Sequence, residues 1–288
     1  MIPNWIVEEL RNELGIEIRE SRSVSGGSIN RAYKLLTSRG KLFLKYNKNA
    51  PPGFFHKEAD GLTLLKHPKT DLRIPDVISV STQGETGSSF LLMEFIESGQ
   101  GSNSNSFDFG SELAKLHHFE GESYGLDSDN YIGKLPQQNG RYSDWSHFFI
   151  EKRIDPQLKM ALDSGKLSSG ITANWNRLAK RLEDIFPPSR PSLLHGDLWG
   201  GNYLFDASGK AVLIDPAGYY GHPEMDLAFT KMFGGFSDSF YRGYEEISPL
   251  KDGFNNRVQI YNLYPLLVHV NLFGGHYVSS LTNFLRQF

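Results

Sequence analysis

One segment, residues 193–215, constrains the fold of this chain more than any other. It interrupts a chain half that otherwise reads as helices, and it contains two β-type runs, 202–205 and 211–214, around the turn 206–210. Glycines and a polar run, HGDLWGGN at 195–202, precede the first of these runs. The pattern predicts a short β-hairpin set into a helical domain, with a polar loop leading into it.

The spacing within this segment brings three polar side chains together. A hairpin centred on Ser208 and Gly209 would set positions 202 and 215 opposite each other, and facing residues of such a pair lie roughly 5 Å apart. We therefore expect Asn202 and Asp215 to share a divalent cation, with Asp197 on the loop just before them. Amide and carboxylate oxygens are ligands that suit Mg²⁺ held partly by nucleotide phosphates.

The D-x4-N spacing followed by a second Asp matches the catalytic loop of protein-kinase-like phosphotransferases. In those enzymes the first Asp accepts the proton of the substrate hydroxyl, while the Asn and the second Asp hold Mg²⁺. Alone, His195 and Asp197 could be ordinary loop residues or ligands of a structural metal. The facing geometry of Asn202 and Asp215 favours the kinase interpretation.

A cationic anchor for a nucleotide is predicted upstream. Lys45 lies in the run LFLKY (42–46), which is apolar on both faces, so its ammonium group needs a partner. In the helix predicted to follow, Glu58 shares a face with Phe54 and Leu62 by i, i+4 spacing. Because a carboxylate on an apolar face is costly unless paired, we expect a Lys45–Glu58 ion pair that holds the α/β-phosphates. The alternative is a surface lysine and a solvated glutamate.

Residues 25–28, SGGS, precede the first predicted strand. They could place the backbone N–H groups of Gly26, Gly27 and Ser28 over the phosphates, although the full G-x-G-x-x-G pattern is absent. The alternative is a plain turn.

The strand predicted at 89–95 enters a hinge between two lobes. Backbone groups around Glu94 and Ile96 would meet the adenine there, and Met93 would border the adenine pocket. A plain core methionine is the other interpretation of Met93.

The coarse element pattern predicts an α+β, bilobal, protein-kinase-like layout. A β-rich nucleotide-binding lobe spans 1–96, and a larger, mainly helical catalytic and substrate lobe spans 97–288, with the polar run 98–106 as a linker or mobile loop. The expected strands are 31–36, 41–46, 77–82 and 89–95. The expected helices are a short one before residue 14, then 54–66, 107–119, 143–163, 171–186, 226–233, 236–245 and 255–286.

Composition excludes several classes of protein. The 288 residues carry 30 Lys+Arg and 33 Asp+Glu, a net charge of −3, and no cysteine. A nucleic-acid binder usually has a strong basic excess, and thiolate metal sites, disulfides and cysteine nucleophiles need cysteine. The longest apolar stretch, 264–273, is too short to span a bilayer, and the first 14 residues lack the apolar core of a signal peptide. We expect a cytoplasmic protein without nucleic-acid or membrane partners; a monomer is favoured, although the sequence leaves the oligomeric state open.

The whole chain resembles the fructosamine kinase (ketosamine-3-kinase) family, in the aminoglycoside-phosphotransferase-like branch of the kinase fold. The specific blocks are LHGDLWGGN at 194–202, IDPA at 214–217 and YGHPEMDLA at 220–228. The resemblance runs from the segment GGSIN at 26–30 to NLFG at 271–274. Pro216 and Ala217 replace the Phe-Gly that follows this Asp in protein kinases.

The resemblance implies roles for individual residues. Asp197 would be the catalytic base, and His195 and Asp226 would support its loop, although Asp226 could equally cap a helix. Trp199 would offer a flat face to the sugar, and His269 would lie near the substrate unless it is an ordinary core residue.

The family reaction transfers the γ-phosphoryl group of ATP, with Mg²⁺, to the C3 hydroxyl of a ketoamine, free or protein-bound. Fructosamine, ribulosamine and erythrulosamine all fit. The alternatives are a kinase of another small alcohol (an aminoglycoside, choline or homoserine) and a non-catalytic nucleotide-binding scaffold. The scaffold would be expected to lack a base or metal residue, and all of these are present.

Overall fold

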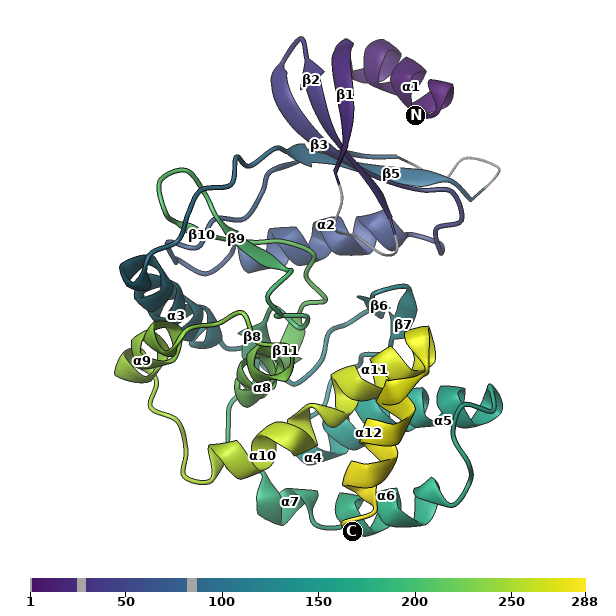
Figure 1. Cartoon of the computed structure of the whole chain (residues 1–288), viewed down its shortest axis with the longest axis vertical. Coiled ribbons are helices and arrows are strands. Elements are labelled where there is room, and N and C mark those ends of the chain that lie inside the picture. Colours follow the sequence, from purple (N-terminus) through teal and green to yellow (C-terminus); the bar gives the residue numbers. More distant parts are fainter. Residues whose placement is uncertain (1, 25–29, 82–86) are drawn as a thin grey trace.

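The computed structural model describes residues 2–24, 30–81 and 87–288. A small antiparallel sheet lobe stands on a larger helical lobe (Figure 1). The sheet has the strand order β1-β2-β3-β5-β4; one helix precedes its first strand and another lies in the connection between β3 and β4. These elements are α1 (Asn4–Leu14), β1 (Ile18–Val24), β2 (Arg31–Thr37), β3 (Gly40–Asn47), α2 (Phe54–Leu65), β4 (Val77–Val80) and β5 (Ser89–Glu94).

The two faces of this sheet have different partners, because successive side chains of a strand point to opposite faces. Leu42 and Leu44 of β3 pack with Ile6 and Leu10 of α1 on one face. The other face carries Lys45 and turns toward α2, which lies between the sheet and the helical lobe (Figure 1). Lys45 is thereby directed into the space between the lobes.

The helical lobe contains the remaining elements. Its helices are α3 (Asn103–His117), α4 (Trp145–Phe148), a π-helical turn (Phe149–Ile154), α5 (Asp155–Asp163), α6 (Ile171–Ala179), α7 (Leu182–Ile185), α8 (Glu224–Met232), α9 (Asp238–Ile247), α10 (Phe254–Tyr261), α11 (Leu263–Phe273) and α12 (His276–Leu285). Three two-stranded ribbons are β6 (Asn130–Ile132) with β7 (Leu135–Gln137), β8 (Ser192–Leu194) with β11 (Tyr219–Gly221), and β9 (Tyr203–Phe205) with β10 (Ala211–Leu213).

The two lobes share part of their apolar core. One buried cluster joins Leu62 of α2 and Met93 of β5 to Leu113 of α3 and Leu213 of β10. The β9–β10 hairpin therefore packs against both lobes. The boundary predicted between residues 96 and 97 falls in the linker after β5 and remains a prediction.

Several predicted elements differ from the structure at their ends. Strand β1 was not predicted, because its sequence, IRESRSV, is polar and mostly exposed and offers no alternating apolar face. The helix predicted over 255–286 is three helices, broken at Asn262 and at the pair Gly274-Gly275, whose φ angles are 65° and 61°. The helix predicted over 171–186 is also broken, between Ala179 and Leu182.

The segment 98–106, predicted to be a linker, is a linker only up to Ser102. Asn103 already begins α3, because the Ser102 hydroxyl accepts the Asn105 N–H and the Asn105 side chain accepts the Ser102 N–H, which is a reciprocal helix cap. The polar composition of this run was therefore read as a linker although a helix begins within it. None of the helices in the described ranges is long and apolar enough to cross a membrane.

Candidate active site

The Lys45 ammonium group lies between two carboxylates. Its Nζ atom donates to Oε1 of Glu58 at 2.6 Å and also to Asp215. Burial alone would lower the pKa of Lys45, but the charges of Asp215 and Glu58 outweigh it and raise the pKa, so the lysine stays protonated. The ion pair predicted between β3 and α2 is present, and Asp215 is a second partner that the sequence pattern did not reveal.

The predicted register of the β9–β10 hairpin is wrong by one residue. Leu213 pairs with Tyr203, and the Ile214 N–H donates to the Asn202 carbonyl at 3.0 Å, so Asn202 faces Ile214 rather than Asp215. The cause is the turn. The Asp206 carboxylate accepts the N–H groups of Ser208 at 2.8 Å and Lys210 at 3.1 Å, which closes a three-residue loop in place of the expected two-residue turn.

The backbone of Asp215 departs from the strand immediately after this pairing. Its φ of 56° lies in the left-handed region, where it is the single non-glycine residue in the described ranges. Such backbone strain is held in place by the surrounding structure and clusters at functional sites. Its carboxylate lies against Lys45 of the sheet lobe.

Asp197 and Asn202 are in direct contact. The Asn202 side-chain amide donates both to Oδ2 of Asp197 and to the Asp197 backbone carbonyl, each at 2.8 Å. Burial and the nearby charge of Asp215 raise the pKa of Asp197 well above its ordinary value, while the Asn202 bond partly opposes that rise. A carboxylate with a raised pKa is a stronger proton acceptor than a solvated aspartate.

The Asp226 carboxylate holds the backbone of the loop that leads to Asp197. Its two oxygens accept the N–H groups of His195 at 2.7 Å and Gly196 at 2.9 Å, and Oδ2 lies 3.3 Å from Nε2 of His117. Burial would raise the pKa of Asp226, but the hydrogen bond and charge of His117 help to hold it below its ordinary value. The N-cap alternative is wrong, because α8 already begins at Glu224.

The His195 ring is also part of this support. Its Nε2 atom lies 2.9 Å from the Ile214 carbonyl, so the ring joins the loop to the strand that leads to Asp215. Burial lowers the pKa of His195, which favours a neutral imidazole.

A small pocket opens in front of Asp197, with a free volume of about 20 Å³. Side chains of β6, β11, α8 and α11 contribute to its wall. His269 of α11 lines it, with Nδ1 2.7 Å from the Pro265 carbonyl, and burial lowers the pKa of its ring. Trp199 is 38% exposed and is linked to the pocket residue His269 through Phe233: the Trp199 and Phe233 ring centres lie 6.3 Å apart, and those of Phe233 and His269 lie 5.0 Å apart.

The pocket also holds residues that the sequence did not single out. Tyr219, Phe229 and Tyr264 line it. Behind them the fully buried guanidinium of Arg153 lies 3.9 Å from the Tyr219 ring centre. Their apolar periodicity is that of ordinary core positions, so no local pattern could have marked them.

The predicted hinge residues have separate environments. Met93 is buried in the core shared by the two lobes, Ile96 is buried just after β5, and the Glu94 carboxylate binds Arg73. The predicted phosphate loop, Gly26, Gly27 and Ser28, lies outside the described residues.

The donor set at the end of the cleft fits a hard cation. Asn202 offers an amide oxygen and Asp215 a carboxylate oxygen. Both residues are attached to the loop that carries Asp197: the Asn202 side chain bonds to Asp197, and the carbonyl of Ile214, the residue before Asp215, contacts the His195 ring. Oxygen donors of this kind match the preference of Mg²⁺ and offer none of the sulfur ligands that softer metals favour.

Comparisons with known proteins agree with this arrangement. The chain matches the fructosamine kinase family over residues 3–288. It is 39% identical over 274 residues to a "Probable ketoamine kinase" of Lactiplantibacillus plantarum, covering 94% of this chain and 95% of that one. It is 37% identical over 291 residues to a chloroplastic protein-ribulosamine 3-kinase of Arabidopsis thaliana, covering 100% of this chain and 87% of the relative.

Solved structures show the same fold. A Thermobifida fusca protein assigned as a fructosamine-3-kinase superposes with a TM-score of 0.87 at 32% identity, covering 99% of this chain and 98% of that one. An aminoglycoside phosphotransferase in complex with AMP-PNP and hygromycin B superposes with a TM-score of 0.67 at 17% identity, covering 99% and 98%. The second likeness extends the fold, and the fold alone, to a protein-kinase-like phosphotransferase.

Proposed function

Because this chain belongs to the fructosamine kinase family, we propose that it is an ATP-dependent kinase that phosphorylates the C3 hydroxyl of a ketoamine, a sugar joined to an amine by glycation. The names of its relatives, ketoamine kinase and protein-ribulosamine 3-kinase, support this substrate class. The observation that carries the proposal is the position of Asp197, which lines an open pocket and is held by Asn202 beside the Lys45–Asp215 pair.

Asp197 acts on the substrate hydroxyl. As the C3 oxygen attacks the γ-phosphorus of ATP, its proton passes to the Asp197 carboxylate, the bond from the γ-phosphorus to the bridging oxygen breaks, and ADP leaves. The protein contributes mainly position and charge, because phosphoryl transfer needs little covalent chemistry from it. The buried surroundings of Asp197 strengthen it as a base.

The nucleotide side of the cleft supplies positive charge. Lys45 remains protonated and is oriented by Glu58, so it can contact the phosphates without losing its position. Asn202 and Asp215 would hold Mg²⁺, which neutralises phosphate charge when bound. Met93, Glu94 and Ile96 remain the proposed border of the adenine site, and Gly26, Gly27 and Ser28 the proposed phosphate loop.

The pocket is the proposed sugar site. His269, whose pKa is lowered by burial, can hydrogen-bond a sugar oxygen, and the partly exposed Trp199 offers a flat apolar face. The amine carried by the sugar can be a free amino acid or a protein side chain.

Phosphorylation would then lead to deglycation. A phosphate at C3 is a better leaving group than hydroxide, so the adduct loses a proton and inorganic phosphate by elimination. Water then hydrolyses the remaining link between carbon and nitrogen, which releases the free amine and a 3-deoxy dicarbonyl sugar. The cell would recover an unmodified amine without a separate hydrolase.

The experiment that tests the proposal is ADP release with Mg²⁺ and ATP across fructosyl-, ribulosyl- and erythrulosyl-lysine, kanamycin and choline. Turnover on a ketoamine supports it, and the ranking names the sugar. Turnover on kanamycin or choline alone would assign the chain a different alcohol. ATP binding without turnover on any of the five would favour a scaffold.

A further inference from the structure

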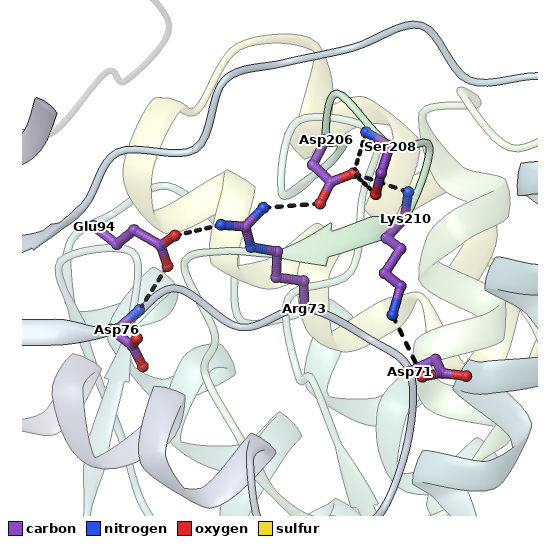
Figure 2. Close-up of polar contacts among 7 residues, drawn as sticks. All are labelled: Asp71, Arg73, Asp76, Glu94, Asp206, Ser208 and Lys210. Carbon is purple, nitrogen blue, oxygen red and sulfur yellow. Dashed lines mark hydrogen bonds and ion pairs between the residues drawn. The ribbon is translucent and has the colours of Figure 1, made fainter.

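Three segments that are distant in the sequence meet on one arginine (Figure 2). Arg73 lies between α2 and β4. Its Nη2 atom donates to Glu94 at the end of β5, and its Nη1 atom donates to Oδ2 of Asp206 at 2.8 Å. Asp206 is the residue whose carboxylate closes the turn of the β9–β10 hairpin. One guanidinium therefore joins the sheet lobe, the start of the linker and the tip of the hairpin.

The backbone around Arg73 is attached to the same hairpin. The Arg73 N–H donates to the Ala211 carbonyl at 2.9 Å, and the Leu213 N–H donates to the Arg73 carbonyl at 3.0 Å, so this segment extends the hairpin by a parallel bridge along β10.

The opposite edge of the hairpin is held by the linker. The Gly99 N–H donates to the Phe205 carbonyl at 2.7 Å. A Cβ atom at Gly99 would lie 2.3 Å from the Asp206 carbonyl oxygen, so the linker approaches the turn as closely as a glycine allows. The hairpin is thus fixed between two segments that both lead to the sheet lobe.

This hairpin carries both proposed metal ligands. Asn202 directly precedes β9, Asp215 follows β10, and the two strand ends are joined by the hydrogen bond from the Ile214 N–H to the Asn202 carbonyl at 3.0 Å. Any shift of the hairpin against the linker therefore moves both ligands relative to the strand end at Glu94, where the nucleotide base is proposed to bind.

Arginine suits this task because its planar, fork-shaped group can bind two carboxylates at once, whereas a lysine offers a single point charge. The Arg73 and Glu94 side chains are 38% and 32% exposed, so solvent partly screens their attraction, while Asp206 is buried with only 6% exposed. The partly exposed Arg73–Glu94 pair contributes little to global stability. Its geometric effect on the hairpin is then the more important one.

We propose that Arg73 is a positioning residue that sets the hairpin bearing Asn202 and Asp215 against the hinge, and thereby tunes the affinity of the cleft for magnesium–nucleotide. The inference rests on the proposed nucleotide site but not on the identity of the sugar substrate. Arg73 itself touches neither the pocket nor the Lys45 cluster.

The chain offers a matched control beside it. Lys210 reaches Asp71 across the same junction at 3.5 Å, and these side chains are 57% and 79% exposed (Figure 2). Lys210→Met removes a neighbouring cation without touching the Arg73–Glu94–Asp206 contacts. Glu94→Gln weakens the contact with Arg73, changes the acceptor of the long 3.4 Å bond from the Asp76 N–H, and leaves the turn at Asp206 intact.

The test is calorimetric titration with Mg·AMP-PNP in the absence of sugar. We expect Arg73→Met to weaken binding by roughly three- to tenfold, from two partly screened contacts. Glu94→Gln should weaken it by a similar factor, the Arg73→Met/Glu94→Gln double variant by no more than the larger single effect, and Lys210→Met by less than about twofold. Hydrogen exchange of residues 203–213 in the nucleotide-free protein should be faster in Arg73→Met and unchanged in Lys210→Met.

Unchanged nucleotide affinity in both Arg73→Met and Glu94→Gln would overturn the inference. So would equal losses in the Lys210→Met control, or equal rises in the KM values for ATP and ketoamine, since a merely structural role predicts such uniform effects. If Arg73→Met does not fold, Glu94→Gln alone decides by the same affinity criterion. A native protein that binds Mg·AMP-PNP but phosphorylates no ketoamine would refute the proposed function and leave this test intact.

Discussion

Oδ2 of Asp226 accepts the backbone N–H of His195 at 2.7 Å, and the second carboxylate oxygen binds the next N–H along the loop. That next residue, Gly196, has a φ of 80°, and a Cβ atom there would lie 2.2 Å from the Ala217 carbonyl oxygen. A buried carboxylate therefore fixes the backbone of the loop just before Asp197. The position of the proposed base depends on this contact.

Asp226→Asn should lower kcat more than it raises either KM. An amide presents an NH₂ group where one of the two loop N–H groups needs an acceptor, so the loop shifts and Asp197 loses its alignment. We expect a loss of about a hundredfold in kcat, in line with small displacements of catalytic groups. Steady-state kinetics measure it, and a variant with native kcat would show that the loop is held by other contacts.

Lys45→Met should both destabilise the protein and weaken nucleotide binding. The Glu58 side chain, 11% exposed, would be left as a buried carboxylate without its cation, which costs about 3 kcal/mol of unfolding free energy. Urea unfolding measures this cost.

A Lys45→Met/Glu58→Leu double variant separates the two effects. Removing the orphaned carboxylate should restore part of the stability, whereas nucleotide binding should stay weak. Restored binding in the double variant would mean that Lys45 is structural only.

The sequence predicted these contacts unevenly, for physical reasons. The Lys45–Glu58 pair was accessible because helix and strand periodicity are local, and an ionised group on an apolar face needs a partner. The Lys45–Asp215 contact joins residues far apart in the chain across the cleft, and no local pattern encodes it. The predicted hairpin register was wrong for a different reason: the Asp206 carboxylate accepts the Ser208 N–H and so sets the length of the turn, and a change of one residue in turn length changes every pairing.

Folding stability should fall as the pH drops below about 6.5, partly through His222. Burial lowers the pKa of His222 in the folded protein to about 3. The unfolded chain binds a proton near the ordinary histidine pKa. Between about pH 6.5 and pH 3 the free energy of unfolding therefore falls by up to about 1.4 kcal/mol for each pH unit.

His222→Gln provides the comparison. It removes the titrating group and the Nδ1 acceptor of the Glu224 N–H, so the variant should be less stable than the native protein at pH 7. Its unfolding free energy should nevertheless fall less between pH 7 and pH 5. Parallel slopes in urea unfolding would contradict the assignment.

Gly110→Ala should separate α3 from α9. A Cβ atom at Gly110 would lie 1.9 Å from the Phe240 carbonyl oxygen, which is backbone and cannot rotate away. We expect a loss of about 2 kcal/mol in unfolding free energy. Gly170→Ala, where the Cβ meets nothing within 4 Å, is the control and should change stability by less than about 0.5 kcal/mol. Equal effects of the two variants would contradict the close packing of these helices.

The bilobal fold and its chemistry were predictable because HGDLWGGN and IDPA are short motifs with fixed spacing. The wall of the pocket was not, since Tyr219, Phe229 and Tyr264 have the periodicity of ordinary core residues. Arg73 was also missed, because it lies in a connection without a motif. Its role depends on its ion pairs with Glu94 and Asp206, which are distant from it in the sequence.

The central claim is that Asp197 directs phosphoryl transfer to one sugar oxygen. The most direct measurement is ³¹P–¹H NMR of the product formed from Mg·ATP and the best ketoamine, with native protein and with Asp197→Asn. We predict phosphate on the C3 oxygen with native protein, followed by release of inorganic phosphate and free amine, and a rate that is about a hundred- to ten-thousandfold lower in Asp197→Asn. Phosphate on another oxygen, or an Asp197→Asn variant that turns over at the native rate, would contradict the account.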